Sequence, residues 1–289
     1  MKLSLRIICF FFFTLLVKAE EFPLQISAKV DTVLSPYMVE WSELQSLSIT
    51  LNNTSSKEIH YKIDISIVRE GTLCAKTNTA LAAVRTLLPG AGITLSTTDV
   101  LPLSTLRLFT KHSTLDKRAG ALTTSGNYSV CVNITDTTGT TFLAKPICSK
   151  ASIKAYTLPV LLSPINNDSV PTSAIRFSWY PVTPKPPKIL YKLQCYPLGS
   201  VNPAQAIRNN QPVLTTIVTD APTFVWHIPD SVANGNYVWH LISTRPDGIA
   251  YGSGDGYSAI GEFTINRTTT PITPNTQPVL KEQKKKKKK

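Results

Sequence analysis

The sequence predicts an all-β protein built from two tandem β-sandwich domains of the immunoglobulin or fibronectin type III kind. Short runs in which apolar and polar residues alternate recur along the chain, which is typical of strands with one face in a core. Turn-forming residues separate these runs, and long helices are not expected anywhere. A mature chain of about 270 residues is long for one sandwich and suits two domains.

The second domain is expected over residues 157–265 and has the clearest pattern. In Ile175–Pro181, Trp179 and its alternate neighbours should face the core, which leaves Tyr180 on the opposite face. Seven or so such strands in about 105 residues favour a sandwich of fibronectin type III topology. The other expected strands are Ile189–Cys195, Val213–Val218, Thr223–His227, Tyr237–Ser243 and Phe263–Ile265.

The first domain is expected over residues 20–156. Its predicted strands are Leu24–Val30, Leu47–Leu51, Ile59–Val68, Val130–Ile134 and Thr141–Ile147. Between about 73 and 124 the alternation weakens, and only Ile93–Leu95 is expected there as a short strand. We therefore expect a long irregular insertion, which is the candidate for a distinctive surface. Within it, Leu103–His112 fits either one helix or a packed loop.

The N-terminus has the pattern of a secretory signal peptide over residues 1–19. Lys2 and Arg6 precede the apolar run Ile7–Val17, and cleavage is expected between Ala19 and Glu20. This run of eleven residues is shorter than the roughly 20 that a membrane-spanning helix needs. We therefore expect an exported protein that is periplasmic, associated with the outer membrane or on the cell surface.

Residues 266–289 are expected to be a disordered Thr/Pro-rich stalk with a polylysine tail. The formal net charge of +12 falls to +3 once the signal and tail charges are set aside, so the folded body is nearly neutral and nucleic acid is not an expected partner. The tail is a candidate tether to anionic lipid, lipopolysaccharide or acidic polysaccharide, or else a solubilising segment without a dedicated partner. Its final lysines are Lys284, Lys285, Lys286, Lys287, Lys288 and Lys289.

Four cysteines follow the signal peptide. Cys131 and Cys148 flank the turn at 136–139, and a hairpin centred there would place them nearly opposite each other on the outer face. In an exported protein this pair is expected to form a disulfide, although two free thiols remain the alternative. Cys74 and Cys195 fall in different expected domains and are predicted to be free.

Catalytic and ligand-binding patterns are sparse. His227 and His240 lie on neighbouring predicted strands, and a hydrolase would require them to converge with an acid; the alternative is that they are structural strand residues. No cofactor or metal motif is evident. Carbohydrate binding would require exposed aromatic side chains. The candidates are Tyr180 and Tyr251 above all, with Tyr191, Tyr196 and Trp226.

Several short motifs are spread over about residues 22–265. They are Phe22-Pro-Leu-Gln-Ile, Ser35-Pro-Tyr37, Gly120-Ala-Leu122, Gly126-x-Tyr128-x-x-Cys131, Cys148, Leu158-Pro-x-Leu, Ser163-Pro-Ile-Asn, Phe177-x-Trp179-x-Pro181 and Tyr237-x-Trp239. Together these motifs resemble the TANFOR domain family of exported proteins from Bacteroidetes-type bacteria. The resemblance implies an extracytoplasmic, all-β, non-catalytic protein with a fibronectin type III-like second half, and it implies no shared ligand. The chain departs from the family in its shortness, its lysine ending and the lack of an evident sorting domain.

Together these features predict a non-catalytic cell-envelope or surface protein that acts as an interaction or adhesion-type module. Its expected partner is a protein or polysaccharide of the envelope. A carbohydrate-binding accessory protein and a hydrolase on a β-sandwich scaffold are the alternatives.

Overall fold

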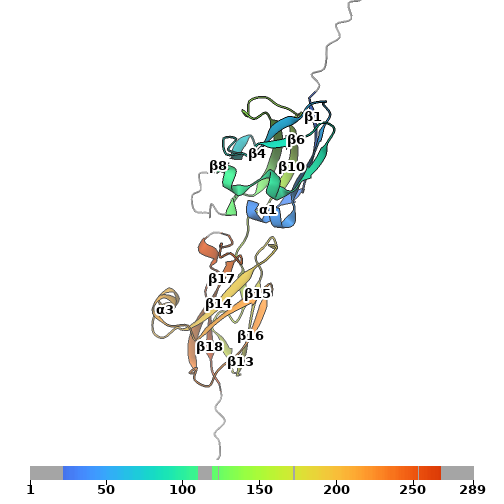
Figure 1. Ribbon diagram of the computed structural model, residues 1–289. Coiled ribbons are helices and arrows are strands. Elements are labelled where there is room, and N and C mark those ends of the chain that lie inside the picture. The colour runs from blue at the N-terminus through green and yellow to red at the C-terminus, as the bar shows by residue number, and fades with distance from the viewer. Residues whose placement is uncertain (1–21, 110–118, 123, 172, 253, 268–289) are drawn as a thin grey trace, which may run out of the picture. The chain divides into compact units, whose positions relative to one another are not determined.

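A computed structural model describes residues 22–109, 119–122, 124–171, 173–252 and 254–267 (Figure 1). The predicted signal peptide, its cleavage site and the lysine tail lie outside these residues. The chain forms two compact units. The first joins residues up to Leu158 with Val182–Ile189 and Thr244–Asp255, and the second contains Pro159–Pro181, Leu190–Ser243 and the residues from Gly256 onward. The expected boundary at 156/157 stays a prediction.

The described residues are mostly strand, which confirms the all-β class. None of the described helices is long and apolar enough to cross a membrane. The α-helices are α1 (Met38–Leu44), α2 (Thr97–Val100) and α3 (Pro203–Asn209).

The first unit contains two sheets. A three-stranded antiparallel sheet has the order β1-β3-β7, and a larger sheet has the order β2-β10-β9-β4-β5-β8, with β6 paired to β4. Their apolar faces share one core, which includes Leu47, Ile65 and Val130. The strands are β1 (Leu24–Val30), β2 (Val33–Leu34), β3 (Leu47–Asn53), β4 (Ile59–Arg69), β5 (Thr72–Thr77), β6 (Arg85–Leu87), β7 (Gly92–Leu95), β8 (Leu106–Leu108), β9 (Gly126–Thr135) and β10 (Ile147–Ile153).

The second unit also contains two sheets, of orders β11-β13-β16 and β12-β18-β17-β14-β15. Phe177 of β13 contacts Trp239 of β17 and Phe263 of β18, with ring centroids 4.8 and 5.9 Å away, so the two sheets pack face to face. Trp179 is buried and Tyr180 is 62% exposed, as alternation predicts. The strands are β11 (Val160–Ser163), β12 (Asp168–Val170), β13 (Ala174–Tyr180), β14 (Leu190–Pro197), β15 (Leu214–Thr219), β16 (Thr223–His227), β17 (Gly235–Thr244) and β18 (Gly261–Ile265).

The expectation of an irregular insertion over residues 73–124 is wrong for its described part. Those residues supply β5, β6, β7 and β8, which pair with β3 and β4 or with each other. Each of these strands has three to six residues. β7 contains the short strand expected at Ile93–Leu95. The runs of β5, β6 and β8 show too few alternations to display a period, so only pairing with a neighbouring strand reveals them. Within Leu103–His112, a 3-10 turn at Leu103–Thr105 precedes β8.

The second strand of the predicted disulfide hairpin also begins later than expected. The prediction was Thr141–Ile147, whereas β10 covers Ile147–Ile153. The loop between them is closed by Asp136, whose carboxylate accepts hydrogen bonds from the hydroxyl of Thr138 and the N–H groups of Thr140 and Thr141. The Thr138 bond, with the backbone bonds, lowers the pKa of Asp136 to about 2. The hydrogen-bonded turn therefore extends beyond residue 139, to Thr141.

Candidate functional site

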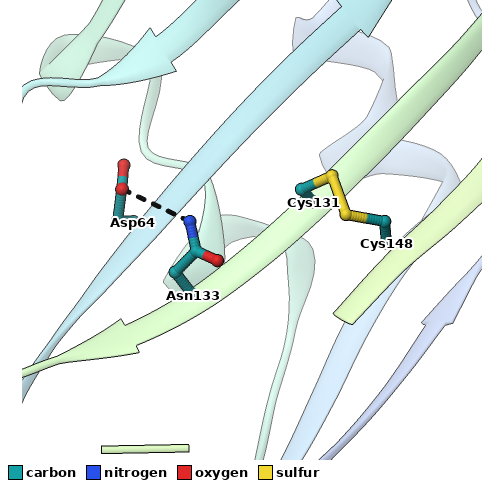
Figure 2. The surroundings of a disulfide bond; sticks show 4 residues. All are labelled: Asp64, Cys131, Asn133 and Cys148. Atoms are coloured by element: carbon teal, nitrogen blue, oxygen red, sulfur yellow. Dashed lines mark hydrogen bonds between the residues drawn. A yellow bond between two sulfur atoms is a disulfide. The ribbon is translucent and has the colours of Figure 1, made fainter. Parts of the chain in front are cut away.

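The disulfide prediction is confirmed. Cys131 and Cys148 are directly paired across β9 and β10 and are bonded, at a sequence separation of 17. Figure 2 shows the bond together with Asp64 and Asn133. Cys131 and Asn133 share the outer face of the sheet because the core residues of β9 alternate with them. Cys74 and Cys195 are free and buried, as predicted.

Asp64 is an unusual residue on that outer face, because it is only 5% exposed. Asn133 donates a hydrogen bond to Oδ2 at 3.5 Å, and the Lys76 ammonium lies 3.5 Å from the same oxygen. Oδ1 has no hydrogen-bond partner among the described residues. Lys76 neutralises the buried carboxylate, so the arrangement is an ion pair that ties β5 to β4, with β9 attached through Asn133.

The most elaborate polar cluster of the first unit surrounds Glu40, which we call the Glu40 cluster. Glu40 lies on α1 and is completely buried. Its Oε1 accepts hydrogen bonds from Arg245 Nη1 at 2.9 Å and from the Tyr251 hydroxyl at 3.0 Å. Its Oε2 accepts from the hydroxyls of Ser35 and Tyr156. Four hydrogen-bond donors therefore surround one carboxylate. A buried carboxylate needs such donors in place of water to remain charged.

Arg245 completes the charge balance of the cluster. It is 5% exposed, and it also donates to Glu43 at 2.6 Å and to Asp247 at 3.2 Å. Burial alone would lower the pKa of Arg245, but its hydrogen bonds to Glu43, Glu40 and Asp247 outweigh burial and raise it. The guanidinium therefore stays charged, and it joins Thr244–Asp255 to α1 within the first unit.

Three tyrosine rings enclose the ion pair. Tyr37 stacks on Tyr251 with centroids 5.7 Å apart, and the Tyr156 ring meets both rings edge-on. Burial, followed by the nearby Glu40 carboxylate, raises the pKa of Tyr156 and of Tyr251, so both hydroxyls remain protonated donors. Each of these side chains is hydrogen-bonded to, or packed against, another member of the cluster. The cluster is therefore best explained as a structural element that holds Thr244–Asp255 against α1.

His240 in the second unit is buried in a different way. It lies on β17, is 3% exposed, and its Nε2 has no hydrogen-bond partner among the described residues. Its ring stacks on Tyr257 at 5.3 Å and meets Tyr196 at 5.9 Å. Burial, reinforced by the positive charge of Lys192, lowers the pKa of His240 to about 4. His240 is therefore neutral near pH 7.

The convergence of His227 and His240 that a hydrolase would require is not found. Trp226 and Trp239, their neighbours, both point into the core between the two sheets and contact Phe177. Because side chains alternate along a strand, His227 and His240 point outward, away from the core, from different sheets. No cluster of three or more His, Cys, Asp or Glu residues suited to a metal ion occurs in the described part of the chain.

The prediction that Tyr251 is an exposed ligand-contact residue is wrong, because Tyr251 is completely buried in the Glu40 cluster. Sequence alternation could not show this, since Tyr251 lies in a loop that packs against distant residues. Tyr191, Tyr196 and Trp226 are also buried. Among the five aromatic candidates only Tyr180 is exposed, and it stands on the outer face of β13 opposite Val160 of β11.

The outer face of the β11-β13-β16 sheet carries several exposed apolar side chains. Val160 is 59% exposed, Tyr180 62% and Val225 50%. Arg176 lies opposite Val225, and His227 follows on the same face of β16. We call these residues the exposed face of the second unit. The outer face of the three-stranded sheet in the first unit is polar and carries Gln25, Ser27, Lys29, Thr50, Asn52 and Thr94.

Comparisons with known proteins identify no family for the chain. No family model matches it, and no curated protein matches it. Similar solved structures include the alkylpurine DNA glycosylase of Pseudomonas fluorescens (14% identity, 47% of this chain, 31% of that chain, TM-score 0.26). Red sea bream transglutaminase has 11% identity, 84% and 31% coverage and a TM-score of 0.27. The fibronectin(III)-like modules of Clostridium thermocellum CbhA have 10% identity, 83% and 92% coverage and a TM-score of 0.23.

The chain spans 31% of the length of the first two of these structures. With TM-scores below 0.3, none of the three carries an argument about function.

Proposed function

We propose that the protein is a non-catalytic, exported module of the cell envelope that acts through protein or polysaccharide contacts. Its two units are two β-sandwiches, the second with fibronectin type III-like topology. The TANFOR-like motifs and the signal-peptide pattern belong to the same proposal, and the disulfide between Cys131 and Cys148 is consistent with an oxidising compartment.

The observation that carries the proposal is the exposed face of the second unit. Single exposed apolar side chains are common on protein surfaces, but Val160 and Tyr180 lie directly opposite each other on adjacent strands. Val225 adds a third exposed apolar side chain on the same sheet face, whereas the outer face of the β1-β3-β7 sheet is polar. The exposed face of the second unit is therefore the candidate contact surface.

The test of export and tethering is cell fractionation combined with surface protease digestion. The full chain is compared with a chain truncated after Pro278, which lacks the lysine run. We expect the full chain in the envelope fraction and the truncated chain released, because clustered lysines attract anionic surfaces. Retention of both chains in the cytoplasm would refute export. Release of both would refute the tether while leaving export intact.

Carbohydrate binding is the second candidate, and it is favoured by the exposure of Tyr180. A sugar ring could stack on this tyrosine beside Val160, with Ser178 on the same face. Affinity electrophoresis in gels that contain acidic or neutral polysaccharides would show retardation. Tyr180→Ala should abolish the retardation, whereas Tyr257→Ala, an exposed tyrosine elsewhere in the second unit, should preserve it.

A further inference from the structure

A groove of about 370 Å³ lies in the second unit, between the edge strand β11 and the start of β18. Two of its apolar side chains are largely open to solvent, since Val160 is 59% exposed and Ile260 37%. The groove is lined by Pro159, Val160, Leu161, Ile165, Asn166, Asn167, Ala259, Ile260, Gly261 and Glu262.

One wall of the groove presents unpaired main chain. Trp179 of β13 donates its N–H to the carbonyl oxygen of Pro222, on the side of β16. In an antiparallel ladder the main-chain groups of successive residues point to alternate sides. Leu161, which lies opposite Trp179, therefore has no ladder hydrogen bond with it and directs its N–H and C=O to the open edge of the sheet. Leu161 lines the groove.

The facing wall is formed by the start of β18. The carbonyl oxygen of Glu262 accepts a hydrogen bond from the N–H of Asn167, so it points away from β17. Gly261 pairs with Trp239 on β17 and is the first residue of that ladder. Ile260 precedes the strand and lines the groove with its apolar side chain. The unpaired main chain is therefore on the β11 wall, and the β18 wall contributes an apolar side chain and the Glu262 carboxylate.

The groove is also held in shape by the core. The indole N–H of Trp239 donates to the carbonyl oxygen of Pro164 at 2.7 Å, directly after β11. Gly261 permits this contact, because a Cβ there would lie 2.5 Å from the same indole nitrogen. Asp168 accepts a hydrogen bond from the N–H of Ile165 at 3.0 Å, which fixes the turn at the end of the groove. A pre-formed groove reduces the ordering cost of binding.

The charge of the groove indicates what kind of segment it would accept. Glu262 is the one ionisable residue among the ten that line it. The other side chains are apolar, apart from the amides of Asn166 and Asn167. A matching segment therefore carries apolar side chains at alternate positions and a lysine or arginine between them. The four residues of β11 extend about 13 Å, which sets the length at four to six residues.

We propose that this groove binds an extended peptide segment of a partner protein by strand addition to β11, with main-chain hydrogen bonds to Leu161, apolar packing on Ile260 and a basic side chain facing Glu262. Strand addition to a sheet edge obtains affinity from main-chain hydrogen bonds and selectivity from alternate side chains. The proposal rests on the proposed interaction function and assigns it a site and a partner chemistry.

The probe is the acetylated, amidated peptide Thr-Val-Lys-Val-Thr-Val, titrated into the isotope-labelled mature chain and followed by amide NMR shifts. We expect saturable shifts at Leu161 and Ile260. The same peptide with N-methylated valines lacks the donors and should bind about tenfold more weakly or worse. Glu262→Lys should weaken binding about tenfold and should favour a peptide with glutamate in place of the lysine.

Variants at Leu161 separate the main-chain contribution from side-chain packing. Leu161→Pro removes the N–H that faces the open edge of the sheet, whereas Leu161→Val retains it, so only the proline variant should lose binding. Val225→Lys, on the exposed face and outside the groove lining, is the matched control and should bind normally. Thermal melts establish that each variant is folded, and the charge-swap pair keeps the test decisive if Leu161→Pro unfolds.

Three results would overturn the proposal: no saturable shifts, equal binding of the N-methylated peptide, or shifts confined to Arg176, Tyr180 and Val225, which lie on the exposed face and outside the groove lining. Shifts at Leu161 that depend on protein concentration without peptide would also overturn it, because a second copy would then occupy the edge. Localisation is measured separately, so failure of peptide binding leaves the export proposal standing, and cytoplasmic retention leaves the groove result unaffected.

Discussion

The two units bury ionisable side chains by opposite strategies. In the first, Glu40 is completely buried but accepts four hydrogen bonds, one of them from the buried Arg245. In the second, His240 is nearly as buried, yet its Nε2 has no partner among the described residues. The difference is that a carboxylate requires donors to stay charged, whereas a histidine can escape the cost of burial by staying neutral. Acid should therefore act on the two sites differently.

The largest effect is expected from breaking the ion pair of the Glu40 cluster. Glu40→Gln removes the buried one of the three carboxylates around Arg245 and should destabilise the first unit by about 3 kcal/mol, the low end of the cost of breaking a buried ion pair, because Glu43 and Asp247 remain beside the guanidinium. Urea denaturation at pH 7 measures it. The double variant Glu40→Leu with Arg245→Met should cost less than the sum of the single variants. Strict additivity would show that the two charges do not interact.

Removal of the disulfide should come next. Replacing Cys131 and Cys148 by serine opens a closed loop and should cost about 3 kcal/mol in the chain-entropy model. Both cysteines belong to the first unit, so only its unfolding transition should move. Tryptophan fluorescence and near-UV circular dichroism during thermal unfolding distinguish the transitions. An equal shift of the second unit would contradict the independence that the comparison assumes.

The burial of His240 should make the free energy of unfolding of the second unit depend on pH. The expected change is similar to, or slightly smaller than, the loss from removing the disulfide. Its pKa is about 4 when folded and about 6.5 when unfolded, so between these values the unfolded chain binds more protons. Stability is therefore retained above about pH 6.5 and lost as the pH falls toward 4, by up to about 3 kcal/mol. Denaturation at several pH values should show this fall, and His240→Phe should remove it.

His227→Phe is the matched control, because His227 is an exposed histidine of the same unit. It should leave the pH-dependent fall in place. If His240→Phe and His227→Phe behave alike, the loss of stability in acid does not come from the buried ring.

The smallest effect should follow from uncovering His240. Tyr257→Ala removes the ring that stacks on it, and Tyr257 itself is 46% exposed, so its loss costs little packing. Water should then reach the imidazole and raise the pKa of His240 by about one unit toward its ordinary value. NMR titration of the histidine ring protons measures the change. An unaltered pKa would mean that Lys192, and not burial, is its main cause.

Much of the strand arrangement could be predicted, because alternation is strong wherever a strand exceeds about five residues. β1 begins and ends at the predicted residues, and Trp179 and Tyr180 point in the predicted directions. The Glu40 cluster could not be predicted. Glu40 lies in the short helix α1, and Arg245 is 205 residues away, so no local pattern links them. α1 itself has only seven residues, too few to show a helical period.

The sequence by itself determined the all-β class, the pairing of Cys131 with Cys148 and the inward face of each long strand, since these depend on local period and short-range spacing. The tertiary structure decided whether polar side chains are accessible. It buried Tyr251 against Glu40, left Tyr180 exposed, and placed Leu161 of β11 in the lining of the groove. Accessibility depends on which distant segments cover a residue, and that information exists only once the chain has packed.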